Sequence, residues 1–167
     1  MLTLPNRVEL GNANEVYLLS GRLRQVDIDE CRAFTGQDPE KGLIEAWCQS
    51  VVRYCIWRGD RVAACFGLVK RAAPDGYGVP WLLGSDLLGE MKRYFMRITP
   101  TYLSEFLNIA PTLYNYVDAR NEASIRWLKW AGFRVHDPIP MGPGHRPFHP
   151  IVLTKKDFKC ATQQRPQ

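Results

Sequence analysis

The sequence predicts an α/β domain of three layers, in which a mixed central sheet lies between helices on both faces. Apolar runs with strand character alternate with segments of helical periodicity in the order β-α-α-β-β-β-α-α-β-α-β-β. A meander in the middle of the chain is followed by a strand-helix-strand unit, which implies a mixed sheet. At 167 residues the chain has the length of one domain. We expect that domain over 1–154 and a polar, frayed tail over 155–167.

The first elements are short. The apolar run Glu15–Leu19 has the composition of a first strand. Leu23–Phe34 follows with apolar residues near helical spacing, and Gly36 ends it. A second helix should begin at Pro39 with Asp38 as its N-cap, because the carboxylate accepts backbone N–H groups and proline fits the first helical position.

A hairpin in the middle of the chain is the clearest local structure. Val51–Arg58 and Arg61–Val69 are rich in β-branched and aromatic residues. They flank Gly59-Asp60, a glycine-first dipeptide that suits a type II′ turn. We therefore expect two antiparallel neighbours in the sheet.

The register of this hairpin separates two cysteines. A two-residue turn places Tyr54 opposite Cys65 and Cys55 opposite Ala64, so that Cys55 and Cys65 point to opposite sides of the sheet. This register excludes a disulfide between them. The five cysteines of the chain show neither a CxxC pair nor metal-ligand spacing, so we expect reduced thiols and no metal site.

The next elements run from a loop to a pair of helices. Ala72–Gly78 is rich in turn residues, and Val79–Leu83 has strand character. Asp86–Ile98 has a helical composition. A further helix, Thr99–Leu107, should begin at Thr99-Pro100, which has the form of a cap followed by a first helical residue.

The most clearly delimited element is the helix Glu122–Ala131. Asn121 has the position of its N-cap, and Gly132 that of the C′ residue, which needs a positive φ. Phe133 would pack back on Leu128 in a Schellman end. The helix is apolar on most sides, which predicts that much of it is buried.

Three predicted strands precede or follow this helix in the sequence. Leu113–Val117 precedes it, and a short strand at Arg134-Val135 follows it. A loop rich in proline and glycine over Pro138–Pro147 leads to the last strand, Phe148–Leu153.

The stretch Asn121–Phe133 carries a resemblance to a known family. Its pattern N-x-x-S-I-x-W-L-x-x-A-G-F is similar to the N-x-x-A-I-x-L-Y-x-x-x-G-F signature of the GNAT (GCN5-related) N-acetyltransferases. The resemblance implies the GNAT fold. It also implies that the preceding strand lines an acetyl-CoA cleft and that Asn121 contacts the pantetheine arm of the cofactor.

A narrower resemblance covers three segments. Pro80–Asp86, Lys92–Phe95 and Tyr116–Phe133 resemble a GNAT-like group in short-tailed bacteriophages that includes small internal virion proteins. This resemblance implies a virion or assembly component, or a binder of host proteins. Its partners would be phage structural or host proteins, and its location would be the host cytoplasm and the virion.

The cofactor loop of active GNAT enzymes has no counterpart in the sequence. The family's Q/R-x-x-G-x-G/A motif holds the cofactor pyrophosphate with backbone N–H groups at a helix N-terminus. Leu82–Pro100 occupies that position and lacks the motif. A helix beginning at Thr99 could offer its N-terminus to an anion, with Arg97 and Arg93 nearby.

The family's catalytic acid is also missing. GNAT enzymes have a tyrosine on the late helix that protonates the departing thiolate, and the matching position here is Leu128, which carries no proton to donate. Tyr116, or Tyr114 beside it on the preceding strand, is a candidate replacement. Asp86 is a candidate general base, with Glu90 and Asp118 as alternatives.

Two functions follow from these observations. The missing loop and tyrosine favour a GNAT-fold protein that acts by binding, and the alternative is an acetyl-CoA-dependent N-acetyltransferase with a diverged cofactor loop. Nucleic-acid binding is compatible with the net charge of +5 but has no motif behind it. We expect no membrane partner and no secretion, because no apolar run approaches the about 18 residues that span a bilayer and no N-terminal signal is recognised.

Overall fold

The computed structural model describes residues 5–72 and 76–163. Its helices are α1 (Ala13–Ser20), α2 (Gln25–Thr35), α3 (Pro39–Gln49), α4 (Leu87–Glu90), α5 (Lys92–Ile109), α6 (Glu122–Ala131) and α7 (Lys155–Gln163). Its strands are β1 (Asn6–Leu10), β2 (Val52–Arg58), β3 (Arg61–Arg71), β4 (Tyr77–Gly84), β5 (Thr112–Asp118), β6 (Arg134–Val135), β7 (Ile139–Met141) and β8 (Arg146–Thr154).

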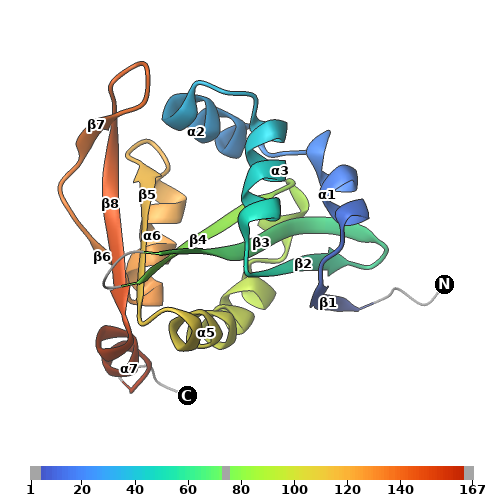
Figure 1. The fold of residues 1–167 in the computed structure, drawn as a ribbon. Coiled ribbons are helices and arrows are strands. Elements are labelled where there is room, and N and C mark those ends of the chain that lie inside the picture. The colour runs from blue at the N-terminus through green and yellow to red at the C-terminus, as the bar shows by residue number, and fades with distance from the viewer. Residues whose placement is uncertain (1–4, 73–75, 164–167) are drawn as a thin grey trace.

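The strands form one mixed sheet in the order β1-β2-β3-β4-β5-β8-β6, with β7 paired to β8 (Figure 1). β4 and β5 are parallel, and the other described pairs are antiparallel. One apolar core lies between the sheet and α4 to α7, and a second lies under α1 and α3 on the opposite face. The predicted three-layer α/β architecture with a mixed sheet is confirmed.

The N-terminal strand prediction is wrong. Glu15–Leu19 lies in helix α1, and β1 comes before it. A capping box starts the helix: the Asn12 side chain accepts the Asn14 N–H, and the Glu15 carboxylate accepts the Asn12 N–H at 2.7 Å. Val16 and Leu19, three apart on the helix, are both buried. This short apolar run forms a helix because its buried residues are spaced to lie on one helical face.

The two helices predicted after this segment are confirmed, with ends that differ by one or two residues. α2 spans Gln25–Thr35 and ends at Gly36, whose φ is 71°. α3 begins at Pro39, and Asp38 accepts the N–H of Glu40 as its N-cap.

The hairpin is present, but its predicted register is wrong. Gly59 has a φ of 63°, as a type II′ turn requires, and the pairs beside the turn follow from it. A β-bulge at Ile56 and Trp57 then shifts the ladder by one residue, so that Cys55 lies directly opposite Cys65. The two cysteines therefore point to the same side of the sheet.

The prediction that a helix begins at Thr99 is also wrong, because α5 runs without a break through Thr99 and Pro100. A proline inside a helix costs about 3 kcal/mol. The same helix buries Leu103, Phe106 and Leu107 in the core, at about 1.5–3 kcal/mol each. The burial outweighs the proline, and the helix continues.

The C-terminal segment is a helix up to Gln163, where a frayed tail was expected. Thr154 caps α7 by accepting the Asp157 N–H and donating its hydroxyl to the Asp157 carboxylate. Phe158 of this helix is buried against the main core. Residues 164–167 of the predicted tail and residues 73–75 of the predicted loop lie outside the described residues. The predicted proline- and glycine-rich loop contains β7.

No helix among the described residues has the length and apolarity to cross a membrane. The same residues contain no group of three or more His, Cys, Asp and Glu side chains placed to hold a metal ion.

Candidate functional site

The candidate site lies where β4 and β5 separate. The two strands are parallel neighbours, and their described register consists of one pair, Gly78 and Leu113. Further along, the Asn115 side chain donates to the carbonyl oxygen of Pro80 at 2.7 Å. The strands diverge beyond this point (Figure 1). Their carboxyl ends, where parallel strands of open sheets usually place ligands, are therefore apart.

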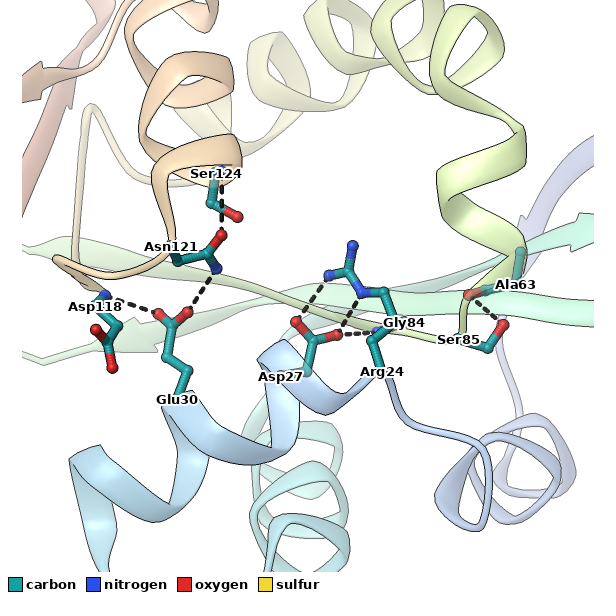
Figure 2. Close-up of polar contacts among 9 residues, drawn as sticks. All are labelled: Arg24, Asp27, Glu30, Ala63, Gly84, Ser85, Asp118, Asn121 and Ser124. Atoms are coloured by element: carbon teal, nitrogen blue, oxygen red, sulfur yellow. Dashed lines mark hydrogen bonds and ion pairs between the residues drawn. The ribbon is translucent and has the colours of Figure 1, made fainter.

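Helix α2 bridges these separated strand ends with two carboxylates, as Figure 2 shows. Asp27 accepts the N–H of Gly84, the last residue of β4, at 2.8 Å. Glu30, one turn further along α2, accepts the N–H of Asp118 at the end of β5 and the Nδ2 of Asn121 at 2.8 Å. Each strand end is thus attached to the same helix.

Arg24 completes the attachment to β4. Its guanidinium donates to both carboxylate oxygens of Asp27, at 3.0 and 2.7 Å, and its backbone N–H donates to the carbonyl of Gly84. Such a bidentate pair is a strong interaction because its two bonds are charge-assisted and parallel. It also supplies a positive charge to a carboxylate that is almost completely buried.

Burial decides the charge properties of the site. It raises the pKa of Glu30 and of Asp27, against the lowering effect of their hydrogen bonds. Burial acts on Asp118 too, but hydrogen bonds from Arg120 outweigh it and hold the pKa of Asp118 below its usual value. Burial, with Asp27 and Glu30 nearby, raises the pKa of Cys31 to about 12. The electrostatic potential around α2 is therefore negative.

A pocket of 260 Å³ opens beside Glu30 at the end of β5. It is lined by Val26, Asp29, Glu30, Asp118, Arg120 and Asn121. Arg120 forms an ion pair with Asp118 at 2.6 Å, which leaves the carboxylates of Asp29 and Glu30 to set the charge of the pocket. A cationic group is the ligand that this charge favours.

A second pocket, of 460 Å³, lies at the start of α5 and has the opposite character. Lys92, Arg93 and Arg97 line it, and the guanidinium of Arg97 lies 5.5 Å from the ring centre of Tyr94. No side chain caps the N-terminus of α5, so the positive end of this helix adds to the three cations. Glu90 also lines the pocket and is paired with Arg58. The pocket suits an anion.

This second pocket revises the predicted anion site. Arg97 and Arg93 do lie near a helix N-terminus, but that terminus is at Lys92. Thr99 is inside the helix, where its hydroxyl donates to the carbonyl of Phe95 at 2.8 Å and its side chain is 5% exposed. Thr99 was assigned to the cofactor as the first residue of a helix, and it does not have that position.

Asn121 is the N-cap of α6, as predicted. Its Oδ1 accepts the N–H of Ser124, and its Nδ2 donates to Glu30. Both polar atoms of the side chain therefore have partners within the protein. Contact with a cofactor through Nδ2 would require exchange with the bond to Glu30.

The candidate catalytic residues lie on different elements of the fold. Asp86 is exposed at the start of α4. Tyr116 is half-buried on β5, with its ring 5.7 Å from that of Phe34 on α2. The hydroxyl of Tyr114 donates to that of Tyr116 at 2.7 Å, and burial together with this bond raises the pKa of Tyr114 to about 12. Tyr116 retains its own hydroxyl proton to donate.

Leu128 occupies an apolar position on α6. Its side chain is buried in the main core, and the neighbouring Trp127 stacks on Phe95 of α5 with ring centres 5.1 Å apart. Leu128, which stands where the GNAT signature has its catalytic tyrosine, is thus part of the packing of α6 against the main core. It supplies packing and no proton.

Sequence reasoning missed Asp27 and Glu30. A signal was present: the two acids are three apart on a predicted helix and so share one face. From the sequence alone, a helix face with two acidic residues is expected to be exposed to solvent. Only the position of α2 across the ends of β4 and β5 shows that the two carboxylates accept backbone N–H groups there.

Comparison with known proteins defines the class of the fold. No protein-family profile and no curated protein sequence matches the chain. Solved acetyltransferase structures do match it over almost its whole length at 7–15% identity, a level that shows the fold alone. The chain has the fold of the GNAT acetyltransferases.

Three neighbours illustrate the match. An aminoglycoside N(6′)-acetyltransferase from Legionella pneumophila has a TM-score of 0.68 at 15% identity, with 99% of each chain covered. The aminoglycoside acetyltransferase AAC(6′)-Ib, bound to coenzyme A and kanamycin, has a TM-score of 0.66 at 13% identity, covering 93% of this chain and 98% of its own. A spermidine N-acetyltransferase from Vibrio cholerae, bound to CoA and spermine, scores 0.63 at 7% identity, covering 92% and 98%.

Proposed function

We propose that the protein is an acetyl-CoA-dependent N-acetyltransferase that acts on a cationic amine. The observation that carries the proposal is the separation of β4 and β5, with a basic pocket at the start of α5 and an acidic pocket beside Glu30. A phosphorylated donor and a positively charged acceptor are the two ligands that these charges favour. The GNAT-fold neighbours that bind coenzyme A support the same choice.

The residues at the start of α5 fit the phosphate groups of acetyl-CoA. The N–H groups of an uncapped helix and the side chains of Lys92, Arg93 and Arg97 are suitable donors for an anion. Acetyl-CoA supplies an activated acetyl thioester when bound. Arg97 is the residue that we assign to the cofactor most directly. Asn121 is proposed as a second cofactor contact, for which its Nδ2 would exchange the bond to Glu30.

The acidic pocket has the chemistry to receive the amine. The carboxylates of Asp29 and Glu30 attract the ammonium form, and the amine must lose a proton before it can attack a carbonyl carbon. Glu30 is suited to accept that proton because burial raises its pKa. Tyr116, with its free hydroxyl proton, is the proposed acid, and Asp86 is a second carboxylate at the end of β4.

A second function is favoured by Leu128. A GNAT-fold protein without the tyrosine at that position can bind a ligand or partner without turnover. The resemblance to internal virion proteins of short-tailed phages adds the specific proposal of a virion component or host-protein binder with phage or host proteins as partners. Mass spectrometry of purified particles tests that proposal, and absence from the particle excludes the virion role.

The enzyme proposal is tested first by calorimetric titration with acetyl-CoA. We expect binding in the micromolar range, weakened about 10- to 150-fold by Arg97→Ala, since a hydrogen bond to a charged group contributes about 1.5–3 kcal/mol. Arg126→Ala is the matched control, because it removes an exposed arginine of α6 whose ion pair among the described residues is with Glu122 at 3.4 Å. Absence of heat at millimolar acetyl-CoA would contradict the proposal.

Turnover is tested separately with kanamycin and spermine as acceptors and mass spectrometry of the acetylated amine as the readout. Glu30→Gln should lower kcat in the neutral range with a smaller effect on the affinity for acetyl-CoA, because the substitution removes a proton acceptor from the other pocket. Binding of acetyl-CoA without any acetylated product would favour the binding protein over the enzyme.

A further inference from the structure

The two cysteines of the β2–β3 hairpin lie face to face. Cys55 and Cys65 are direct register partners, and their Sγ atoms are 3.2 Å apart. Opposed residues of an antiparallel pair have Cα atoms about 4.5 or 5.5 Å apart. Both distances fall within the about 4.4–6.8 Å that a disulfide spans. The backbone is therefore already placed for a bond between the two sulfur atoms.

The β-bulge creates this arrangement. Trp57 pairs with Val62 beside the turn, whereas Ile56 pairs with Ala64, so that Ala63 has no partner on β2. The extra residue turns the following side chains to the other face, because successive residues of a strand alternate. Without it, Cys65 would lie opposite Tyr54.

The pair is closed off from solvent. Both cysteines are 0% exposed, under α1 and α3. Gly11 helps to seal the site, since a Cβ at Gly11 would lie 2.9 Å from the Cys55 Sγ and would clash with the ring of Trp47. The hydrogen bond with Cys65 and burial raise the pKa of the Cys55 thiol, and the thiolate is the attacking form. Reaction in the folded state is therefore slow.

We propose that Cys55 and Cys65 are an oxidative modification site that takes a small-molecule disulfide as its oxidant. One cysteine thiolate attacks the reagent disulfide, which forms a mixed disulfide and releases one reagent thiol. The second cysteine then attacks the mixed disulfide at the first, which joins the two Sγ atoms and releases the second reagent thiol. Two electrons pass from the cysteines to the reagent, and each cysteine loses its proton. The site is independent of the acetyltransferase proposal.

The test is an equilibrium measurement in a glutathione redox buffer. The full chain is unfolded in urea and either kept there or refolded in the same buffer, so that burial does not prevent exchange. After acid quenching and alkylation, trypsin releases Cys55 in peptide 54–58 and Cys65 in peptide 62–70, each with one cysteine. The disulfide-linked peptides are lighter than the sum of the two reduced peptides by two hydrogen atoms.

We expect the ratio of disulfide to dithiol for this pair to be roughly 30-fold or more higher in the folded protein than in urea, since a disulfide that fits a native structure favours folding to that extent. A ratio in the folded protein equal to or below that in urea would overturn the proposal. Frequent pairing of either cysteine with Cys48, which is exposed on α3, would overturn it as well.

The variant Ala64→Cys/Cys65→Ala is the matched control. It keeps two cysteines in the hairpin but moves one thiol to the preceding residue, which faces the other side of the sheet. Its ratio should fall to the value measured in urea. Where this variant does not fold, the wild-type ratio decides the question alone.

Discussion

Helices α5 and α6 pack on the same face of the sheet, but different interactions hold them in place. α6 begins and ends at local signals. At its start, the Asn121 side chain accepts the N–H of Ser124. At its end, Gly132 is the C-cap, and the N–H of Phe133 donates to the carbonyl of Leu128. α5 has no side-chain cap and contains Pro100 in its interior. It is held by the side chains that it buries in the core.

The difference shows which kind of helix end can be recognised locally. A cap and a glycine at positive φ act within a few residues and independently of the rest of the fold, and the φ of Gly132 is 107°. A helix that continues through a proline depends on contacts from distant parts of the chain. Three experiments follow from this contrast, on the core of α5, the cap of α6 and the Glu30 partner of that cap, and the largest effect is expected in α5.

Phe106→Ala should lower the free energy of unfolding by about 3–5 kcal/mol, because it leaves a cavity where a large side chain is 3% exposed in the core. Urea denaturation followed by circular dichroism measures the change. Ser104→Ala, at an exposed position of the same helix, should stay within about 0.5 kcal/mol. A loss for Phe106→Ala smaller than that for any α6 cap variant would break the contrast.

Asn121→Ala should cost about 2 kcal/mol, since the variant loses the cap of α6 and removes one hydrogen bond from the half-buried Glu30. Asn121→Ser separates the two contributions, because serine keeps the cap but is too short to reach Glu30. Its stability should lie between those of the wild type and the alanine variant. Full recovery in Asn121→Ser would show that the bond to Glu30 adds nothing.

The smallest effect is expected in the pH dependence of stability. Burial raises the pKa of Glu30 above its ordinary value of 4.5 in the folded state. The contribution of Glu30 to stability is therefore complete below pH 4.5 and is lost as the pH rises through the raised pKa. The difference in unfolding free energy between the wild type and Glu30→Gln should therefore decrease from pH 4.5 upward. A difference that increases with pH would show that Glu30 is stabilised as a carboxylate.

The candidate site was predictable only in part. Arg97 and Asn121 were predicted to contact the cofactor; Arg97 lines the pocket at the start of α5, and Asn121 lines the pocket beside Glu30. Thr99 was misplaced because its threonine-proline pair has the form of a helix start wherever it occurs. Asp27 and Glu30 were missed because their partners, Gly84 and Asp118, are distant in the chain.

The sequence by itself determined the α/β architecture, the caps of α3 and α6, and the absence of the family's glycine-rich loop and catalytic tyrosine, because each depends on neighbouring residues. The tertiary structure decided the rest. Core burial carried α5 past Pro100, a bulge set Cys55 against Cys65, and α2 came to lie across the ends of β4 and β5. These outcomes depend on contacts between segments far apart in the chain, whose energies no local pattern contains.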